Sequence, residues 1–297
     1  MPNSIGTPPG ILIGMGILDT LLEEFPALRL ITTDFSAESS LLDQPIKIQS
    51  PNALTADDYD DTNGYVPQVV SQTEYDLTID QHVHVTYGFS DTERSKHDIG
   101  LIDRFARNGA HAIGKRLYDE LFALVKNDPF SNKSIITPGS INRLSYVAIN
   151  KILNGRKLPK AGRFSILNSD YYATLSEDAS LVANPGSPAG TVRSGEIGNV
   201  DGVSTLEYAF LDDNDEYLAG FVGTAEALLL ATRLPTPPDM TKLGGSIEVI
   251  THPETKLSLQ LRQWYDFRYG KEFRTYTLQF GVGTGDPARL ERIVTQE

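Results

Sequence analysis

The residues that could carry chemistry in this chain are histidines, aspartates and glycines, because the sequence contains no cysteine. Disulfides, thiol nucleophiles and cysteine-ligated zinc sites are therefore excluded, and a cysteine-free composition fits a reducing compartment. His82 and His84 lie two residues apart, so they share one face of a strand and have a geometry that can bind a metal. No third ligand lies near them, which favours two ordinary histidines on a solvated or subunit-facing strand.

A cluster of four aspartates could bind calcium through its carboxylates. It consists of Asp57, Asp58, Asp60 and Asp61. The spacing is not that of an EF-hand loop, and Tyr59 interrupts the run. We therefore expect an acidic, turn-forming tip rather than a calcium site.

Two glycine-rich stretches and one aromatic stretch could bind a cofactor or a sugar. Gly14-Met-Gly16 lacks the third glycine of a dinucleotide loop, and Gly281-Val-Gly283-Thr-Gly285 lacks the lysine of a phosphate loop, so we expect a flexible arm and a turn. The aromatic residues of stretch 263–267 are more typical of strand core than of a stacking platform. No serine stands in a nucleophile elbow. The sequence therefore predicts no catalytic, cofactor-binding or metal-binding residue.

The element that carries the two histidines is unusually long. Apolar and polar residues alternate over residues 75–89, which is the period of a strand with one buried face. Such a strand would reach about 50 Å, whereas the usual strand has about 5–6 residues. We expect it to overhang its own domain and its apolar face to be covered by another molecule. The apolar face consists of Tyr75, Leu77, Ile79, Val83, Val85, Tyr87 and Phe89.

A helical period follows at once, over residues 99–126. One side is apolar, and the opposite side is basic. The helix would span about 42 Å and end before Asp128-Pro129. The basic side consists of Arg104, Arg107, His111 and Lys115.

The remaining elements are shorter. Residues 17–25 suit an amphipathic helix that ends at Pro26. We expect Ser140 and Ser169 to cap two further helices, and the first of these to end at Asn154-Gly155. Residues 163–167, 247–250, 256–267 and 273–282 read as strands. The small apolar residues of 219–234 could form either a helix or a strand.

Composition excludes two classes of protein. No run of 18 apolar residues is present, which argues against a membrane span. The net charge is −13, whereas a nucleic-acid reader needs a basic footprint. With 297 residues and 40% hydrophobic residues, the chain is long enough for one or two packed domains.

The order of these parts resembles the major capsid protein of tailed bacteriophages, the Hong Kong ninety-seven fold, over nearly the whole chain. Residues 47–94 look like the family's extended loop, and residues 99–126 like its spine helix. Five later stretches are also similar to features of the family. They are Leu158-Pro159 followed by residues 163–171, the turn Gly195-Glu-Ile-Gly198, the stretch 221–235, His252-Pro253, and Gly281 with Pro287.

The resemblance implies an α+β fold in four parts. These are an N-terminal arm (1–45), an extended β-hairpin loop (46–94), a peripheral domain with the spine helix (95–132 and 246–297) and an inserted axial domain (133–245). It implies a homo-oligomeric virion shell of pentamers and hexamers, without catalysis or cofactor, that encloses packaged double-stranded DNA without sequence-specific binding. We expect no scaffolding segment before the arm, so the resemblance implies either a separate scaffolding protein or a different assembly route, together with a portal. Assembly would occur in the bacterial host cytoplasm.

Two other functions remain open at this stage. An encapsulin-type nanocompartment shares the fold and holds enzymes, and a soluble α+β enzyme would be a compact monomer or small oligomer. For the capsid, we expect the acidic tip (Asp57, Asp58, Asp60, Asp61) to contact a neighbour's basic stripe (Arg104, Arg107, Lys115). Because residues 48–95 contain no lysine, we also expect no covalent cross-link between subunits through this loop.

Overall fold

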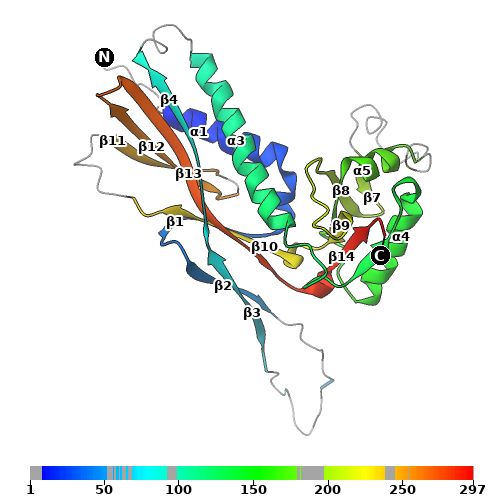
Figure 1. The fold of residues 1–297 in the computed structure, drawn as a ribbon. Helices are drawn as coiled ribbons and strands as arrows, with labels where there is room; N and C mark the ends of the chain where they lie inside the picture. Colours follow the sequence, from blue (N-terminus) through cyan, green and yellow to red (C-terminus); the bar gives the residue numbers. More distant parts are fainter. Residues whose placement is uncertain are drawn as a thin grey trace, which may run out of the picture.

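The computed structural model describes residues 9–51, 56, 58–59, 61, 65, 69–91, 99–178, 181, 197–237, 245–253 and 255–296. These residues form two mixed sheets, the helices that cover them, and a separate two-stranded hairpin (Figure 1). No helix in these segments is long and apolar enough to cross a membrane.

The first sheet has six strands, and its longest strand is β13, which runs diagonally across the molecule (Figure 1). Strand β1 is parallel to β10, whereas the other neighbours are antiparallel. The path along the sheet is β1 (Thr32–Ser40), β10 (Leu228–Pro235), β13 (Lys271–Thr284), β12 (Ser258–Asp266) and β11 (Gly245–Thr251), and β4 (Gln81–Ser90) also pairs with β13.

Two long helices, α1 (Pro9–Glu24) and α3 (Ile99–Phe122), cover one face of this sheet and bury the main core. The close approach of the helices depends on Gly114, where a Cβ would lie 2.3 Å from the ring of Phe25. The backbone N–H of Ala27 donates to the Tyr118 hydroxyl at 2.6 Å. The two predicted helices are confirmed, although α3 ends four residues before Lys126 and α1 begins at Pro9, so that Gly14-Met-Gly16, expected to be a flexible arm, is helical. The N-terminal helix is a packed part of the core, joined to β1 by the 3-10 turn Pro26–Arg29.

The second sheet has its own core and its own helices. Tyr146 of α4 (Arg143–Gly155) and Tyr171 of α5 (Ser169–Ser176) are buried in that core. The strand order is β5 (Lys133–Ile135), β14 (Leu290–Val294), β9 (Leu218–Gly223), β6 (Phe164–Leu167), β8 (Val203–Glu207) and β7 (Gly198–Val200). Short 3-10 turns lie at Pro138–Ser140, Ala225–Ala227 and Pro287–Arg289.

The helix caps differ from the predicted ones by one or two residues. Asn142 and Asn168 are the N-caps, and each side chain accepts from the backbone N–H three residues later, at 3.1 Å. Ser140 lies in a 3-10 turn, and Ser169 is already the first helical residue. Asparagine accepts the same bond that serine would, so the helices themselves were correctly predicted. The end of α4 at Gly155 is also confirmed.

The apolar stretch 219–234, left open between helix and strand, forms β9 and β10. Nearly every residue of both strands is buried. Strands covered on both faces read as continuous apolar runs instead of alternating ones, which is why the period was ambiguous.

The sheets divide the chain differently from the expected domain bounds. Strand β10 falls within the expected axial segment 133–245 but pairs in the first sheet, and β14 falls within the expected peripheral segment but lies in the second sheet between β5 and β9. The chain therefore crosses between the two sheets once more than expected, through β13 and the turn Pro287–Arg289.

The expectation of one long unpartnered strand over residues 75–89 is wrong. Asp80 divides it into β3 (Gln72–Ile79) and β4. Strand β4 pairs with β13 of the same chain from Ser90 to Gln81, and Val83, Val85 and Tyr87 pack against the main core. The β4 part of the apolar face is thus partly buried beneath α3, where a Cβ at Gly109 would lie 2.1 Å from the Tyr87 hydroxyl.

Candidate functional site

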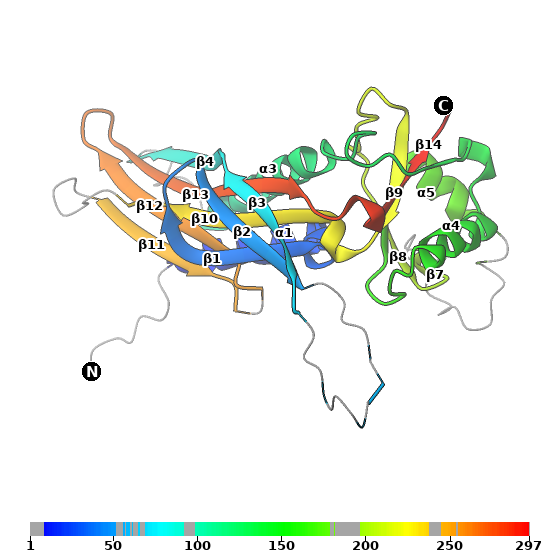
Figure 2. The same cartoon turned by 90° about the horizontal axis from the view of Figure 1, so that it is seen from below.

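The feature that stands apart from both sheets is the hairpin of β2 (Gln44–Pro51) and β3. Within the described residues its two strands pair only with each other, and they project away from the first sheet (Figures 1 and 2). Lys47 and Glu74 form a cross-strand ion pair at 2.8 Å, but both side chains are largely exposed, so it contributes little stability. The hairpin is therefore available to contact another molecule.

The root of the hairpin is fixed on the opposite face of the first sheet from the helices. Side chains alternate along β13, so that Tyr276, Leu278 and Phe280 point into the helix-covered core. Leu77 and Ile79 of β3 instead form a separate buried cluster with Ala231 of β10. The hairpin is thus rigidly placed at its root and free of the sheet beyond it.

Two glycines of β13 make this close crossing possible. A Cβ at Gly281 would lie 2.1 Å from the carbonyl oxygen of Thr78, and one at Gly283 would lie 2.6 Å from a methyl group of Leu77. The stretch 281–285 is therefore no phosphate loop, but the predicted turn is also wrong, because both residues lie inside β13. Glycine inside a strand often marks the close approach of another backbone, and that is its role here.

The predicted contact residues belong to the loop between β2 and β3 and to α3, and among the described ones Lys115 forms no ion pair with Asp58 or Asp61. Asp58 and Asp61 are exposed, whereas Asp57 and Asp60 lie outside the described residues. Arg104 and Arg107 belong to α3, but their side chains are not among those described.

Two described residues on the basic side of α3, Lys115 and His111, have partners in their own chain. Lys115 lies 2.5 Å from Asp119 and stacks over the ring of Phe210 at 4.9 Å. His111 lies 2.9 Å from Glu24 of α1. A neighbour's carboxylates would have to compete with these contacts.

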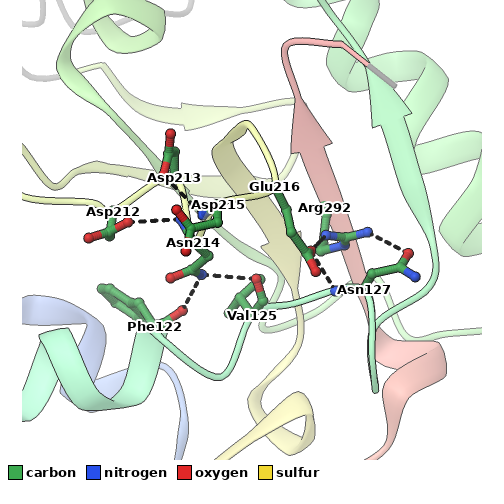
Figure 3. A network of polar contacts seen from close by, with 9 residues as sticks. All are labelled: Phe122, Val125, Asn127, Asp212, Asp213, Asn214, Asp215, Glu216 and Arg292. Carbon is green, nitrogen blue, oxygen red and sulfur yellow. Dashed lines mark hydrogen bonds and ion pairs between the residues drawn. The ribbon is translucent and has the colours of Figure 1, made fainter.

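A polar network that the sequence did not predict joins the end of α3 to the second sheet (Figure 3). It centres on the acidic loop, which we define as residues 209–217 between β8 and β9. The Asn214 amide donates to the carbonyl groups of Phe122 and Val125 at 3.0 Å each, which satisfies two acceptors at the helix end. Asn214 has φ +55, a conformation that asparagine tolerates better than most residues.

The second half of this network is an ion pair that involves a buried arginine (Figure 3). Arg292 of β14 is 2% exposed and pairs with Glu216, and it also donates to the Asn127 side chain at 2.9 Å. Glu216 accepts from the backbone N–H of Asn127 at 2.6 Å. The run of turn-forming residues 212–216 was the sequence signal for this loop, but its partners are too distant in the chain to predict.

The remaining sequence candidates have structural roles. The ring of His82 lies 2.8 Å from the Thr277 hydroxyl, and burial, with lesser effects of Arg262 and His84, lowers its pKa. Trp264 stacks on Phe273 at 5.3 Å as part of the sheet. No group of three or more metal-ligating side chains occurs in the described part of the chain.

No protein-family model and no curated protein matches this chain. Solved structures do match it. The capsid of cyanophage P-SCSP1u is similar with a TM-score of 0.56 and 11% identity, over 89% of this chain and 86% of that one. The capsid of Ralstonia phage GP4 matches with a TM-score of 0.52 and 11% identity, over 89% of this chain and 86% of that one. A virus-like particle from Pyrococcus furiosus matches with a TM-score of 0.51 and 10% identity, over 94% of this chain and 96% of that one. The chain has the fold of the tailed-phage capsid proteins.

Proposed function

We propose that this chain is the major capsid protein of a tailed bacteriophage, which assembles into an icosahedral shell of pentamers and hexamers around double-stranded DNA. The observation that carries the proposal is the match to phage capsids over nearly the full length of both chains. The projecting hairpin supports it, because a rigidly rooted hairpin whose strands pair only with each other among the described residues suits an interlocking subunit.

The charge of the chain is consistent with a container for DNA. With a net charge of −13 the wall would repel the phosphate backbone instead of binding it, so DNA could be packed inside without sequence-specific or tight contact. A separate scaffolding protein and a portal would serve assembly in the bacterial host cytoplasm.

We assign the four expected parts to this fold as follows. The first sheet with α3 is the peripheral domain, and the second sheet with α4 and α5 is the axial domain, which would meet its copies at the capsomer centre. The hairpin β2–β3 is the extended loop. Residues 1–45 include the N-terminal arm, whose helix α1 strengthens the peripheral core.

The hairpin tip is proposed to contact the basic side of a neighbour's α3. The residues of this contact are Asp57, Asp58, Asp60, Asp61, Arg104, Arg107 and Lys115. Exposed ion pairs contribute only ~0–1 kcal/mol each, but the contact would repeat throughout the shell and weaken with salt.

A charge exchange tests the tip contact. Arg104→Glu with Arg107→Glu should yield a soluble subunit that assembles poorly, and Asp57→Lys with Asp58→Lys should restore part of the assembly. Normal assembly of the double-arginine variant at low salt would show that the tip binds elsewhere.

Electron microscopy of the purified protein tests the function itself. We expect closed icosahedral particles that contain nucleic acid. An encapsulin-type shell is the second candidate, favoured by the similarity to the Pyrococcus furiosus virus-like particle, and it would contain a protein cargo instead. A chain that sediments as a compact monomer would contradict both and favour a soluble enzyme.

A further inference from the structure

The outer face of α4 is apolar although it points away from its own sheet. Tyr146, Ile149 and Leu153 fill the core on the inner face. On the other side, Leu144, Val147 and Ile152 are 72%, 44% and 39% exposed. We call these three residues and Ala148 the α4 stripe. A helix that is apolar on two opposite sides is normally buried on both, and the described part of the chain leaves this stripe exposed.

Free positive charges accompany the α4 stripe. Lys151, Lys157 and Lys160 are exposed, and none of them has an ion-pair partner among the described residues. By contrast, the arginines at the two ends of α4 are paired within the subunit: Arg143 with Asp201 at 3.1 Å, and Arg156 with Glu291 at 2.5 Å.

The acidic loop has the complementary character. Asp212, Asp213 and Asp215 are exposed and form no ion pair with a described residue, and Phe210 and Tyr217 are 54% and 48% exposed. Figures 1 and 2 show this loop and α4 on opposite sides of the second sheet. One side is thus apolar and basic, and the other is aromatic and acidic.

Both surfaces are held rigidly. Arg163 is 3% exposed, and it anchors the end of α4 by donating to the side chains of Asn150 and Asn154 at 2.7 and 2.8 Å. The acidic loop is anchored by Asn214 and Glu216 (Figure 3). Surfaces that are fixed in advance lose little conformational entropy when they bind.

We propose that the α4 stripe of one subunit packs against the acidic loop of the next copy, in a head-to-tail contact that closes a ring. Two different surfaces on opposite sides of one body generate a ring when the rotation between copies closes. Apolar residues at the centre and opposite charges at the rim are the usual composition of such an interface. The inference rests on the proposed shell function and specifies which surfaces form the capsomer.

Cross-linking tests this contact directly, because the chain has no cysteine of its own. Val147→Cys with Asp215→Cys, treated with a short bis-maleimide after assembly, should give a ladder of covalent multimers on a denaturing gel. Each single-cysteine variant should give one band, since a head-to-tail contact does not bring identical residues together. Val249→Cys with Asp215→Cys is the matched control, because Val249 is 49% exposed on β11 of the first sheet.

The outcomes separate this inference from the proposed function. If particles form but the double variant gives no ladder, or if the single variants give the same ladder, the head-to-tail contact is wrong while the shell stands. If the unmodified chain forms no particles, the proposed function fails and the contact fails with it.

A second variant tests, without cross-linking, whether assembly depends on the α4 stripe. Leu144→Asp should leave the urea unfolding midpoint unchanged and abolish rings in sedimentation velocity. Leu41→Asp is its control, because Leu41 is 71% exposed between β1 and β2. Wild-type assembly by Leu144→Asp would overturn the proposal.

Discussion

Replacing Gly281 with alanine should detach the root of the hairpin from the first sheet. The new Cβ would lie 2.1 Å from the Thr78 carbonyl oxygen and 2.8 Å from its carbon, and both are backbone atoms. A backbone atom cannot rotate away, so β3 or β13 must move. Gly283→Ala is milder, because its Cβ would meet the methyl end of Leu77 at 2.6 Å, and a side chain can change rotamer.

The loss of stability can be estimated from the apolar side chains that become exposed when the root of the hairpin moves. Overpacking a well-packed site typically costs about 1–3 kcal/mol. If the root separates entirely, Leu77 and Ile79 lose their cover, and each buried side chain of this size contributes about 1.5–3 kcal/mol. We therefore expect Gly281→Ala to destabilise the subunit by about 2–5 kcal/mol and Gly283→Ala by about 1–2 kcal/mol.

Urea unfolding of unassembled subunits can measure this order. The single tryptophan, Trp264, stacks on Phe273 of β13, so its fluorescence reports on the same strand. Gly139→Ala is the matched control, because a Cβ there has nothing within 4 Å. Equal midpoints for Gly281→Ala and Gly139→Ala would refute the argument that the glycines exist to admit the hairpin.

Three further outcomes follow from the same structure. Boiled particles should run as one band near 32.6 kDa, since residues 48–95 contain no lysine for a cross-link, and a ladder of multimers would contradict this. Chymotrypsin should cut free subunits at the exposed Tyr59 or Tyr65 and spare Tyr87, which lies beneath α3. Assembled shells should resist cleavage at all three positions. Cleavage at Tyr87 in free subunits, detected by mass spectrometry, would contradict the pairing of β4 with β13. Asn214→Gly keeps the φ +55 conformation and removes two hydrogen bonds to the end of α3, so it should lower stability by about 1–3 kcal/mol in urea unfolding, and an unchanged midpoint would show that water replaces them.

The sequence predicted which side chains are buried better than it predicted what buries them. The alternation over residues 75–89 holds in the structure on both sides of Asp80, because β3 and β4 each cover one face. The residues that cover this face lie far along the chain, in β10 and β13 among other elements. The alternation of apolar and polar residues within one segment cannot identify such distant partners. The order of the parts along nearly the whole chain nevertheless predicted the fold, although the single long strand was wrong.

The junction near Arg292 could not be predicted for the same reason. Asn127, Glu216 and Arg292 come from three distant segments, and each residue alone is an ordinary surface residue by type. The glycines of β13 were visible in the sequence, but their purpose depends on a backbone that crosses them. Polar clusters and close approaches of this kind are products of the tertiary fold.

Because β14 lies near the end of the chain, the second sheet can be completed only late in synthesis. This strand lies between β5 and β9, and both pairings join segments far apart in the chain. Until β14 has been synthesised, β5 has no partner among the described strands and β9 has an open edge, which is the kind of backbone that aggregates or recruits other strands. A chain that stops before Leu290 could not complete the platform that holds α4 and the acidic loop.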